Sequence, residues 1–370
     1  MRKERPPTAR KRASVASIPI LVVALFCMAF CPAVSSGQSL ITITGSSMLY
    51  PLETRWAKAY EKSHPDTKIG LYATGSGTGY RQAFLGDVSI GASDAYETKN
   101  IKGRYPDMVI IPVAMEDVEI IYNLPGASRK TPLRLDGETL ALIFLGQIRY
   151  WDDSRLLAEN SGLSLGHHRI RLMHRSDASG TTFVLTDFLS RTSPLWRRTI
   201  GREMSPPWPA GQGLSGSANI SEAVRKTPWS IGYDGHNWVH RFGLLSAALR
   251  NHDGYFVTGS VKTIANAGKS AIRNRPDSQS FNHSIVFWVP GKNVYPAANF
   301  EYWVVNPHLD SESMMEVRHL IHWVLESGQK TSFIESAGFS PVPIDSARPL
   351  LRNLLRDLLP GVAFKVVTPG

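Results

Sequence analysis

Short apolar runs rich in β-branched residues alternate along this chain with longer stretches in which apolar residues recur every three or four positions. The first pattern is typical of strands buried in a sheet, and the second is typical of helices with one buried face. Strands are predicted at residues 40–44, 68–73, 88–92, 108–113, 118–122, 170–174, 229–233, 285–289 and 302–305. Helices are predicted at residues 51–63, 79–85, 137–145, 181–189, 311–326 and 344–359. This alternation predicts an α/β architecture with mostly parallel sheets.

Residues 1–36 have a different pattern, which predicts a secretory signal peptide. Basic side chains at positions 2–12 precede an apolar run over 18–30, and mostly small residues follow at 32–37. This order is that of a signal peptide, here with cleavage near Ser35 or Ser36. The run is shorter than the roughly 20 apolar residues that span a bilayer. A retained membrane anchor is the alternative, and a lipid anchor at Cys31 is disfavoured because bulky Phe30 precedes it.

Setting aside the predicted signal peptide, or leader, changes what the composition of the chain implies. The chain has 370 residues, 42% hydrophobic and 19% charged, which allows a large core and excludes disorder, a coiled coil and collagen. Its net charge of +10 falls to +5 without residues 1–35, because these hold six basic side chains and one acidic one. Nucleic acid is therefore not expected as a partner. Both cysteines, Cys27 and Cys31, also lie in the leader, so the exported chain is expected to have no disulfide.

Polar segments stand where predicted strands end and helices begin, at residues 44–51, 74–79, 91–95 and 174–182. Helix N-termini present unpaired N–H groups and the positive end of the helix dipole, and hydroxyls add donors, so several that converge form a cradle for an anion. Each segment alone is explained equally well as an ordinary helix cap. Together, with an arginine in one and an aspartate in another, they favour an oxyanion site.

Other polar clusters in the chain have simpler explanations. His319 and His322 lie one helical turn apart but lack a third ligand, and His167, His168 and His174 flank a strand. Asp152 and Asp153 are best explained as a helix cap. No Gly-x-Ser-x-Gly or Gly-Lys-Ser/Thr motif occurs. The chain is therefore expected to hold no metal and no cofactor.

Six segments carry a resemblance to a known family: TGSSMLYPLETRWAKAY, ATGSGTGYRQA, VSIGASDA, LGQIRYWDD, RSDASGTTFVLTDFL and WSIGYDG. In these residues the chain resembles the phosphate-binding protein of bacterial ABC phosphate importers, the PstS type. The resemblance implies a type II periplasmic-binding-protein fold, with two α/β lobes joined by crossover strands and the ligand in the cleft. It assigns residues 37–118 and 286–370 to lobe one and 119–285 to lobe two, with hinge strands near 117–121 and 284–289.

The resemblance also implies a set of phosphate contacts. Backbone N–H groups would come from Leu49 and Tyr50, and Ser76 would donate through its hydroxyl and N–H. Asp94 would accept a hydrogen bond from the ligand, and Arg175 would donate to it. N–H and hydroxyl donors would also come from Ser179, Gly180 and Thr181.

Two further residues follow from the chemistry of this set. Asp177 is expected to pair with Arg175 and fix its orientation. Asp94 is expected to select phosphate over sulfate, because only phosphate keeps a proton that a carboxylate can accept near neutral pH. The chain departs from the family at Leu49, where a threonine is common, and in the loop 75–79; Ser47 or Thr78 is expected to compensate.

The resemblance implies a monomeric, non-enzymatic binding protein that works in the periplasm. It would bind inorganic phosphate and deliver it to the membrane permease and ATPase subunits of an ABC importer. Two alternatives stay open: a binding protein or sensor for another tetrahedral oxyanion, and a periplasmic phosphatase or serine hydrolase that uses Ser179 with His174.

Overall fold

A computed structural model describes residues 38–274 and 283–343, which belong to one compact unit. The predicted signal peptide (1–36) and the predicted helix at 344–359 lie outside the described residues. None of the described helices is long and apolar enough to cross a membrane.

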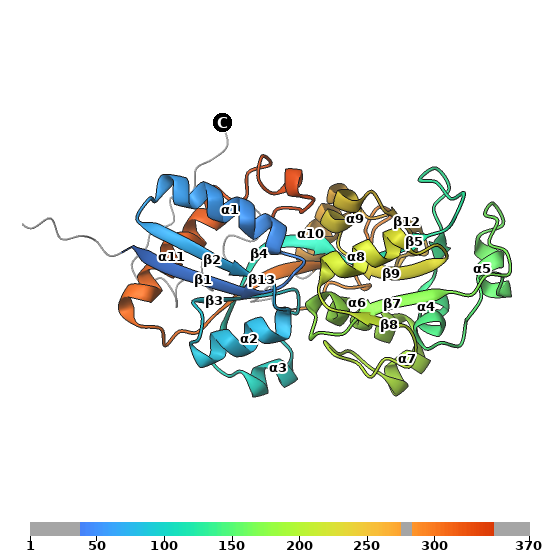
Figure 1. The fold of residues 1–370 in the computed structure, drawn as a ribbon, viewed down its shortest axis with the longest axis horizontal. Coiled ribbons are helices and arrows are strands. Elements are labelled where there is room, and N and C mark those ends of the chain that lie inside the picture. The colour runs from blue at the N-terminus through green and yellow to red at the C-terminus, as the bar shows by residue number, and fades with distance from the viewer. Residues whose placement is uncertain (1–37, 275–282, 344–370) are drawn as a thin grey trace, which may run out of the picture. The chain divides into compact units, whose positions relative to one another are not determined.

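The first sheet combines strands from both ends of the described chain. Its strand order is β2-β1-β3-β13-β4. The strands span β1 (Ser39–Gly45), β2 (Thr67–Tyr72), β3 (Ile90–Ser93), β4 (Val109–Asp117) and β13 (Ala298–Val305). β1 runs parallel to β2 and β3, whereas β13 is antiparallel to both β3 and β4. In Figure 1 the orange β13 therefore lies among the blue and teal strands.

The second sheet is built from one continuous part of the sequence, with the strand order β10-β5-β9-β7-β8. The strands span β5 (Glu119–Asn123), β7 (Arg171–Arg175), β8 (Gln212–Leu214), β9 (Ser230–Asp234) and β10 (Leu245–Ser246). A small third sheet contains β6 (Arg134–Leu135), β11 (Ala248–Arg250) and β12 (Phe256–Val257). Both large sheets are mixed, so the expectation of mostly parallel sheets is corrected.

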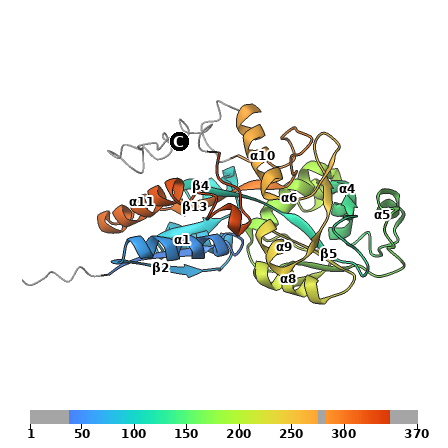
Figure 2. The ribbon, with the colours of Figure 1, turned by 90° about the horizontal axis from the view of Figure 1, so that it is seen from above.

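Helices cover both faces of each large sheet. They span α1 (Tyr50–Ser63), α2 (Ser76–Leu85), α3 (Lys99–Arg104), α4 (Gly137–Phe144), α5 (Ser154–Glu159), α6 (Gly180–Thr192), α7 (Pro194–Thr199), α8 (Ser217–Lys226), α9 (His236–Phe242), α10 (Val261–Asn274) and α11 (Ser311–Glu326), with a 3₁₀ turn at Glu335–Ala337. α1 and α11 pack side by side on the first sheet, as Figure 2 shows. In β5, Ile120 faces the core under α4 and α6, and Ile121 faces the core under α8 and α9.

The chain crosses from the first sheet to the second through β4 and β5, which are separated by Val118 alone. The return crossing runs beside it, because the Val118 N–H donates to the Ala297 carbonyl at 2.9 Å and Ala298 pairs with Asp117. The predicted strand at 284–289 is wrong, and the chain returns to the first sheet at 297–298. The segment 284–289 forms turns, and its apolar pattern arises because Ile285, Val286 and Val289 are buried without pairing in a sheet.

The packing of helix α10 differs from the predicted lobe assignment. It contacts β4 and β13 of the first sheet, although residues 119–285 are assigned to lobe two. The reason is its apolar face, which includes Ile264, Ala267 and Ala271 and joins the core beside Met115 and Phe300. The remaining lobe boundaries stay a proposal.

Candidate functional site

Every predicted site residue lies at or near the end of a helix or strand. Ser76 is the first residue of α2, Tyr50 the first of α1 and Gly180 the first of α6. Asp94 follows β3 directly and Arg175 ends β7. Helix α2 begins three residues before its predicted start, and this shift is what places Ser76 in the first turn.

Asp94 lies at the centre of a buried cluster. Its Oδ1 accepts a hydrogen bond from the Ser76 hydroxyl at 3.4 Å, and its Oδ2 accepts one from the Thr181 hydroxyl at 2.9 Å. Its backbone N–H donates to the Ser76 oxygen at 3.3 Å. All three residues are only 1% exposed. The structure thus brings a carboxylate and two hydroxyls together from α2, the end of β3 and α6.

Glycines permit this close approach. A Cβ atom on Gly180 would lie 2.5 Å from the Ser76 oxygen and 2.8 Å from the Asp94 Cβ. Gly75 has a φ of +90°, which disfavours a side chain, and a Cβ there would lie 2.7 Å from an Asp177 oxygen. No larger residue fits at either position without moving the polar groups of the cluster.

Arg175 is held by a two-point ion pair. Its Nε donates to Oδ1 of Asp177 at 2.7 Å, and Nη2 donates to Oδ2 at 2.5 Å. The guanidinium is almost fully buried, and its Nη1 donates to the Ser217 hydroxyl at 3.1 Å. Burial acts to raise the pKa of Asp177, but the hydrogen bonds and charge of Arg175 outweigh it and lower that pKa. Asp177 therefore stays ionised and fixes the plane of the guanidinium.

Ser217 and Ser46 belong to this region, although sequence analysis did not single them out. Ser217 is the first residue of α8, its N–H donates to the Ser47 hydroxyl at 3.0 Å, and that hydroxyl donates to the Ser217 oxygen at 3.1 Å. Ser47 is thus linked to Arg175 through the Ser217 hydroxyl. Thr78 instead lines a cavity whose lining does not include Arg175 or Ser217. The segment Ser215-Gly216-Ser217 before α8 has the same Ser/Gly pattern as the other loops and could have been recognised by it.

Two of the expected backbone donors are already engaged. The Leu49 N–H donates to the Ser46 hydroxyl at 3.1 Å, and the Leu49 side chain lies in the hydrophobic core between the first sheet and its helices α1 and α11. The Ser179 N–H donates to the Met204 carbonyl at 3.0 Å, and its hydroxyl accepts from Thr182 N–H as a helix cap. At α6 the first-turn N–H groups of Gly180 and Thr181 have no partner inside the helix. These two are the donors that the helix offers.

Comparisons with known proteins place this chain in a family. Residues 32–308 match a family model described as a PBP superfamily domain. The phosphate-binding protein PstS of Methanocaldococcus jannaschii is 31% identical over 328 residues, which cover 84% of each chain. The PstS of Haemophilus influenzae is 31% identical over 306 residues, covering 82% of this chain and 89% of that protein. The chain belongs to the PstS family.

Solved structures show the same fold as this PstS family member. A putative phosphate ABC transporter substrate-binding protein with bound phosphate from Clostridium perfringens has a TM-score of 0.58 at 18% identity, covering 82% of this chain and 100% of that one. The periplasmic phosphate-binding protein PfluDING has a TM-score of 0.60 at 18% identity, covering 86% and 98%. The α/β architecture is thus the type II periplasmic-binding-protein fold.

His174 lies near the candidate site of this PstS family member but has other contacts. Its Nδ1 lies 3.1 Å from the Arg175 carbonyl, and its ring stacks on Trp208 with centroids 4.8 Å apart. Burial lowers the pKa of His174. The polar contact of the Ser179 hydroxyl is the Thr182 N–H. These contacts give no support to a Ser179–His174 catalytic pair.

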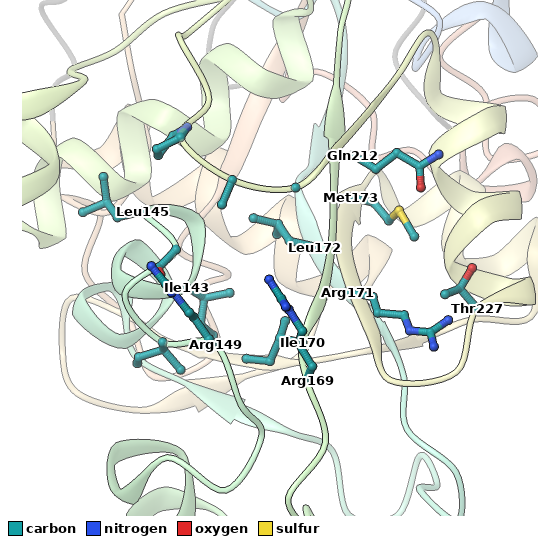
Figure 3. A pocket seen from close by; sticks show the side chains of 15 residues that line it. Ile143, Leu145, Arg149, Arg169, Ile170, Arg171, Leu172, Met173, Gln212 and Thr227 are labelled. Carbon is teal, nitrogen blue, oxygen red and sulfur yellow. The ribbon is translucent and has the colours of Figure 1, made fainter.

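A separate cavity of about 730 Å³ lies in the part of this PstS family member that carries the second sheet. Arg149 and Arg169 stand side by side along it, and Arg171 extends toward Thr227 (Figure 3). Its lining includes none of the predicted phosphate contacts. Within the described residues, no group of three or more His, Cys, Asp or Glu is arranged to hold a metal ion.

Proposed function

We propose that this chain binds inorganic phosphate outside the cytoplasmic membrane and delivers it to the permease and ATPase subunits of an ABC importer. The observation that carries the proposal is the buried cluster of Ser76, Asp94 and Thr181. It joins hydroxyl donors to one acceptor, which is the combination that a protonated oxyanion requires. Names of the relatives support the same ligand, because PstS proteins of two genera match most of the chain.

In this proposal the anion contacts residues from the regions of both large sheets at once. Buried polar groups need partners, since each one left unpaired costs about 1–3 kcal/mol. Neutral N–H and O–H donors would spread the ligand charge, and Arg175 would add a charged donor from a position fixed by Asp177. The proposed contacts are Leu49, Tyr50, Ser76, Asp94, Arg175, Ser179, Gly180 and Thr181. Leu49, Ser179 and the hydroxyls of Ser76 and Thr181 could donate to the ligand only after a change in their present hydrogen bonds.

Calorimetric titration of the exported protein with phosphate, arsenate and sulfate tests this function. We expect phosphate and arsenate to bind and sulfate to bind much more weakly. Tight sulfate binding would instead support the alternative of a general oxyanion-binding protein. A chromogenic phosphate ester should not be hydrolysed, and turnover would support the phosphatase alternative. We further propose that the chain is exported through residues 1–36 and acts as a monomer, which mass determination in solution would test.

A further inference from the structure

Glu301 lies directly behind the candidate phosphate site. In the antiparallel pair of β3 and β13, Tyr302 is opposite Ser93 and Trp303 is opposite Ala92. Glu301 precedes Tyr302 and Asp94 follows Ser93, so these two residues come just beyond the last recorded pair, and both are 1% exposed. The Asp94 charge acts on Glu301. Two buried carboxyl groups therefore lie close together at the end of β3.

The two carboxyl groups have unequal surroundings. Asp94 accepts hydrogen bonds from the hydroxyls of Ser76 and Thr181. Within the described residues, neither oxygen of Glu301 has a hydrogen-bond partner, and none of the groups that shift its pKa is a cation. The other titratable groups that act on Glu301 are acids, namely Glu116 of β4 and Glu53 of α1. Only the Asp94 side of the pair is built to hold a negative charge.

Electrostatics agrees with this geometry. Burial raises the pKa of Glu301 well above its usual value, and the nearby charges of Asp94 and Glu116 raise it further. A buried carboxyl group with neither a donor nor a cation beside it keeps its proton. The hydrogen bonds at Asp94, and their absence at Glu301, therefore put a proton on Glu301.

We propose that Glu301 is a positioning residue that is protonated and holds the Asp94 carboxylate toward the ligand by donating a hydrogen bond to it. The inference rests on the proposed function and deepens it. The O–H of Glu301 donates to Asp94, and the remaining lone pairs of Asp94 accept the proton of phosphate. Without this donor, Asp94 would be a buried carboxylate short of partners, which raises the free energy of its negative charge. Selectivity for protonated oxyanions rests on that charge and therefore depends on Glu301.

The test compares Glu301→Gln with Glu301→Leu in the exported protein. The glutamine amide can still donate to Asp94, so Glu301→Gln should keep the ratio of sulfate to phosphate dissociation constants within about twofold of wild type. Leucine removes the donor, so in Glu301→Leu this ratio should fall by about tenfold or more at pH 7. Glu53→Gln, which changes another buried acid near Glu301, serves as the matched control and should leave the ratio unchanged.

Two outcomes would overturn the proposal. An unchanged ratio in folded Glu301→Leu would show that Asp94 does not need the donor. A gain of about tenfold in the affinities of both phosphate and sulfate in Glu301→Gln would show that Glu301 is ionised in the wild type, because the variant then removes a negative charge from the site.

Infrared difference spectroscopy keeps the proposal testable without ligand and without the leucine variant. The spectrum of wild type minus Glu301→Gln should contain the carbonyl stretch of a protonated carboxylic acid at neutral pH, and a carboxylate band in its place would refute the proposal. If the wild type binds none of the three anions, the proposed function fails. The infrared result still decides where the proton lies.

Discussion

At the scale of single residues, this protein buries charge in two ways. Arg175 is ionised and its charge is matched by Asp177 through two hydrogen bonds. Several carboxyl groups, among them Glu53, Glu116 and Glu301, are buried with few or no matching cations, and burial raises the pKa of each. Charged and neutral acids therefore lie close together around the end of β3, and substitutions at each should have different consequences.

Arg175→Ala should nearly abolish phosphate binding. Loss of a buried charged donor costs about 2–5 kcal/mol, and Asp177 would be left without its partner. Arg175→Lys should also weaken binding, because an ammonium group cannot reproduce the two-point pair. Calorimetry measures the change, and Arg171→Ala, an exposed arginine on the same strand, is the control. Native affinity in Arg175→Ala would remove Arg175 from the proposed site.

Asp94→Asn should shift selectivity toward sulfate. The amide keeps the size of the side chain but removes its charge, so the repulsion of sulfate is lost while phosphate keeps its other donors. The quantity to measure is the ratio of the two dissociation constants at fixed pH and salt. If that ratio stays at its wild-type value, Asp94 is not the residue that discriminates.

Glu53 should make stability depend on pH. Burial raises its pKa from 4.5 to about 8, while the Trp303 N–H, which donates to it at 2.8 Å, lowers the pKa in part. The folded state thus holds a proton that the unfolded state releases above pH 4.5. Its contribution is complete below that pH and is lost as the pH rises toward 8.

Urea unfolding at a series of pH values measures this contribution. The slope from this one group is at most about 1.4 kcal/mol per pH unit, and Glu53→Gln should remove it. Glu222→Gln changes a partly buried acid on α8 and should leave the slope in place. An identical slope in wild type and Glu53→Gln would show that Glu53 does not titrate on unfolding in this range.

At the scale of elements, the beginnings of α2 and α6 determine how closely polar groups meet. Gly180→Ala should weaken phosphate binding strongly and destabilise the fold, because the new Cβ would lie 2.5 Å from the Ser76 oxygen. Gly103→Ala, in α3, meets no atom within 4 Å and should be neutral or slightly stabilising. Thermal unfolding and calorimetry on both variants test the contrast, and equal effects would contradict it.

The individual strands and helices show how much of the fold could be predicted from the sequence. Strands such as β1 and β9 are short apolar runs, α1 has a proline in its first turn and α11 is capped by Asp310, and the predicted positions of all four agree closely with the structure. The segment 284–289 misled the prediction because buried apolar side chains in turns produce the same pattern as a strand. The ion pair of Arg175 and Asp177 follows from their spacing, whereas Ser217 reaches Ser47 only through tertiary folding across 170 positions.

At the scale of the whole molecule, contacts far apart in sequence link the first-sheet and second-sheet regions. Tyr96, shortly after β3, donates to Asp187 of α6 at 3.0 Å, and Arg202 donates to the Tyr96 hydroxyl. The Arg202 guanidinium also lies 5.2 Å from the centre of the Tyr96 ring and 5.3 Å from that of Phe183. Since the proposed ligand touches both regions, these contacts should act together with it to favour a closed state.

Arg202→Ala should therefore release phosphate several-fold faster without a matching change in association rate. Stopped-flow displacement measures the two rates, with Arg149→Ala at the separate cavity as control. Solution scattering should give a smaller radius of gyration with phosphate than without it. Unchanged release in Arg202→Ala would show that this contact does not hold the closed state, and identical scattering profiles would argue against closure itself.

The position of β13 between β3 and β4 also affects the order in which the two large sheets can form. Residues 119–246 contain every strand of the second sheet, so that sheet can form as soon as they are available. The first sheet cannot, because β3 and β4 meet only through a strand that begins at Ala298. Pairings between such distant residues form slowly. β1, β2 and β3 can pair with one another, but the first sheet is complete only when almost the whole chain is available, and until then β3 and β4 each keep an unpaired edge.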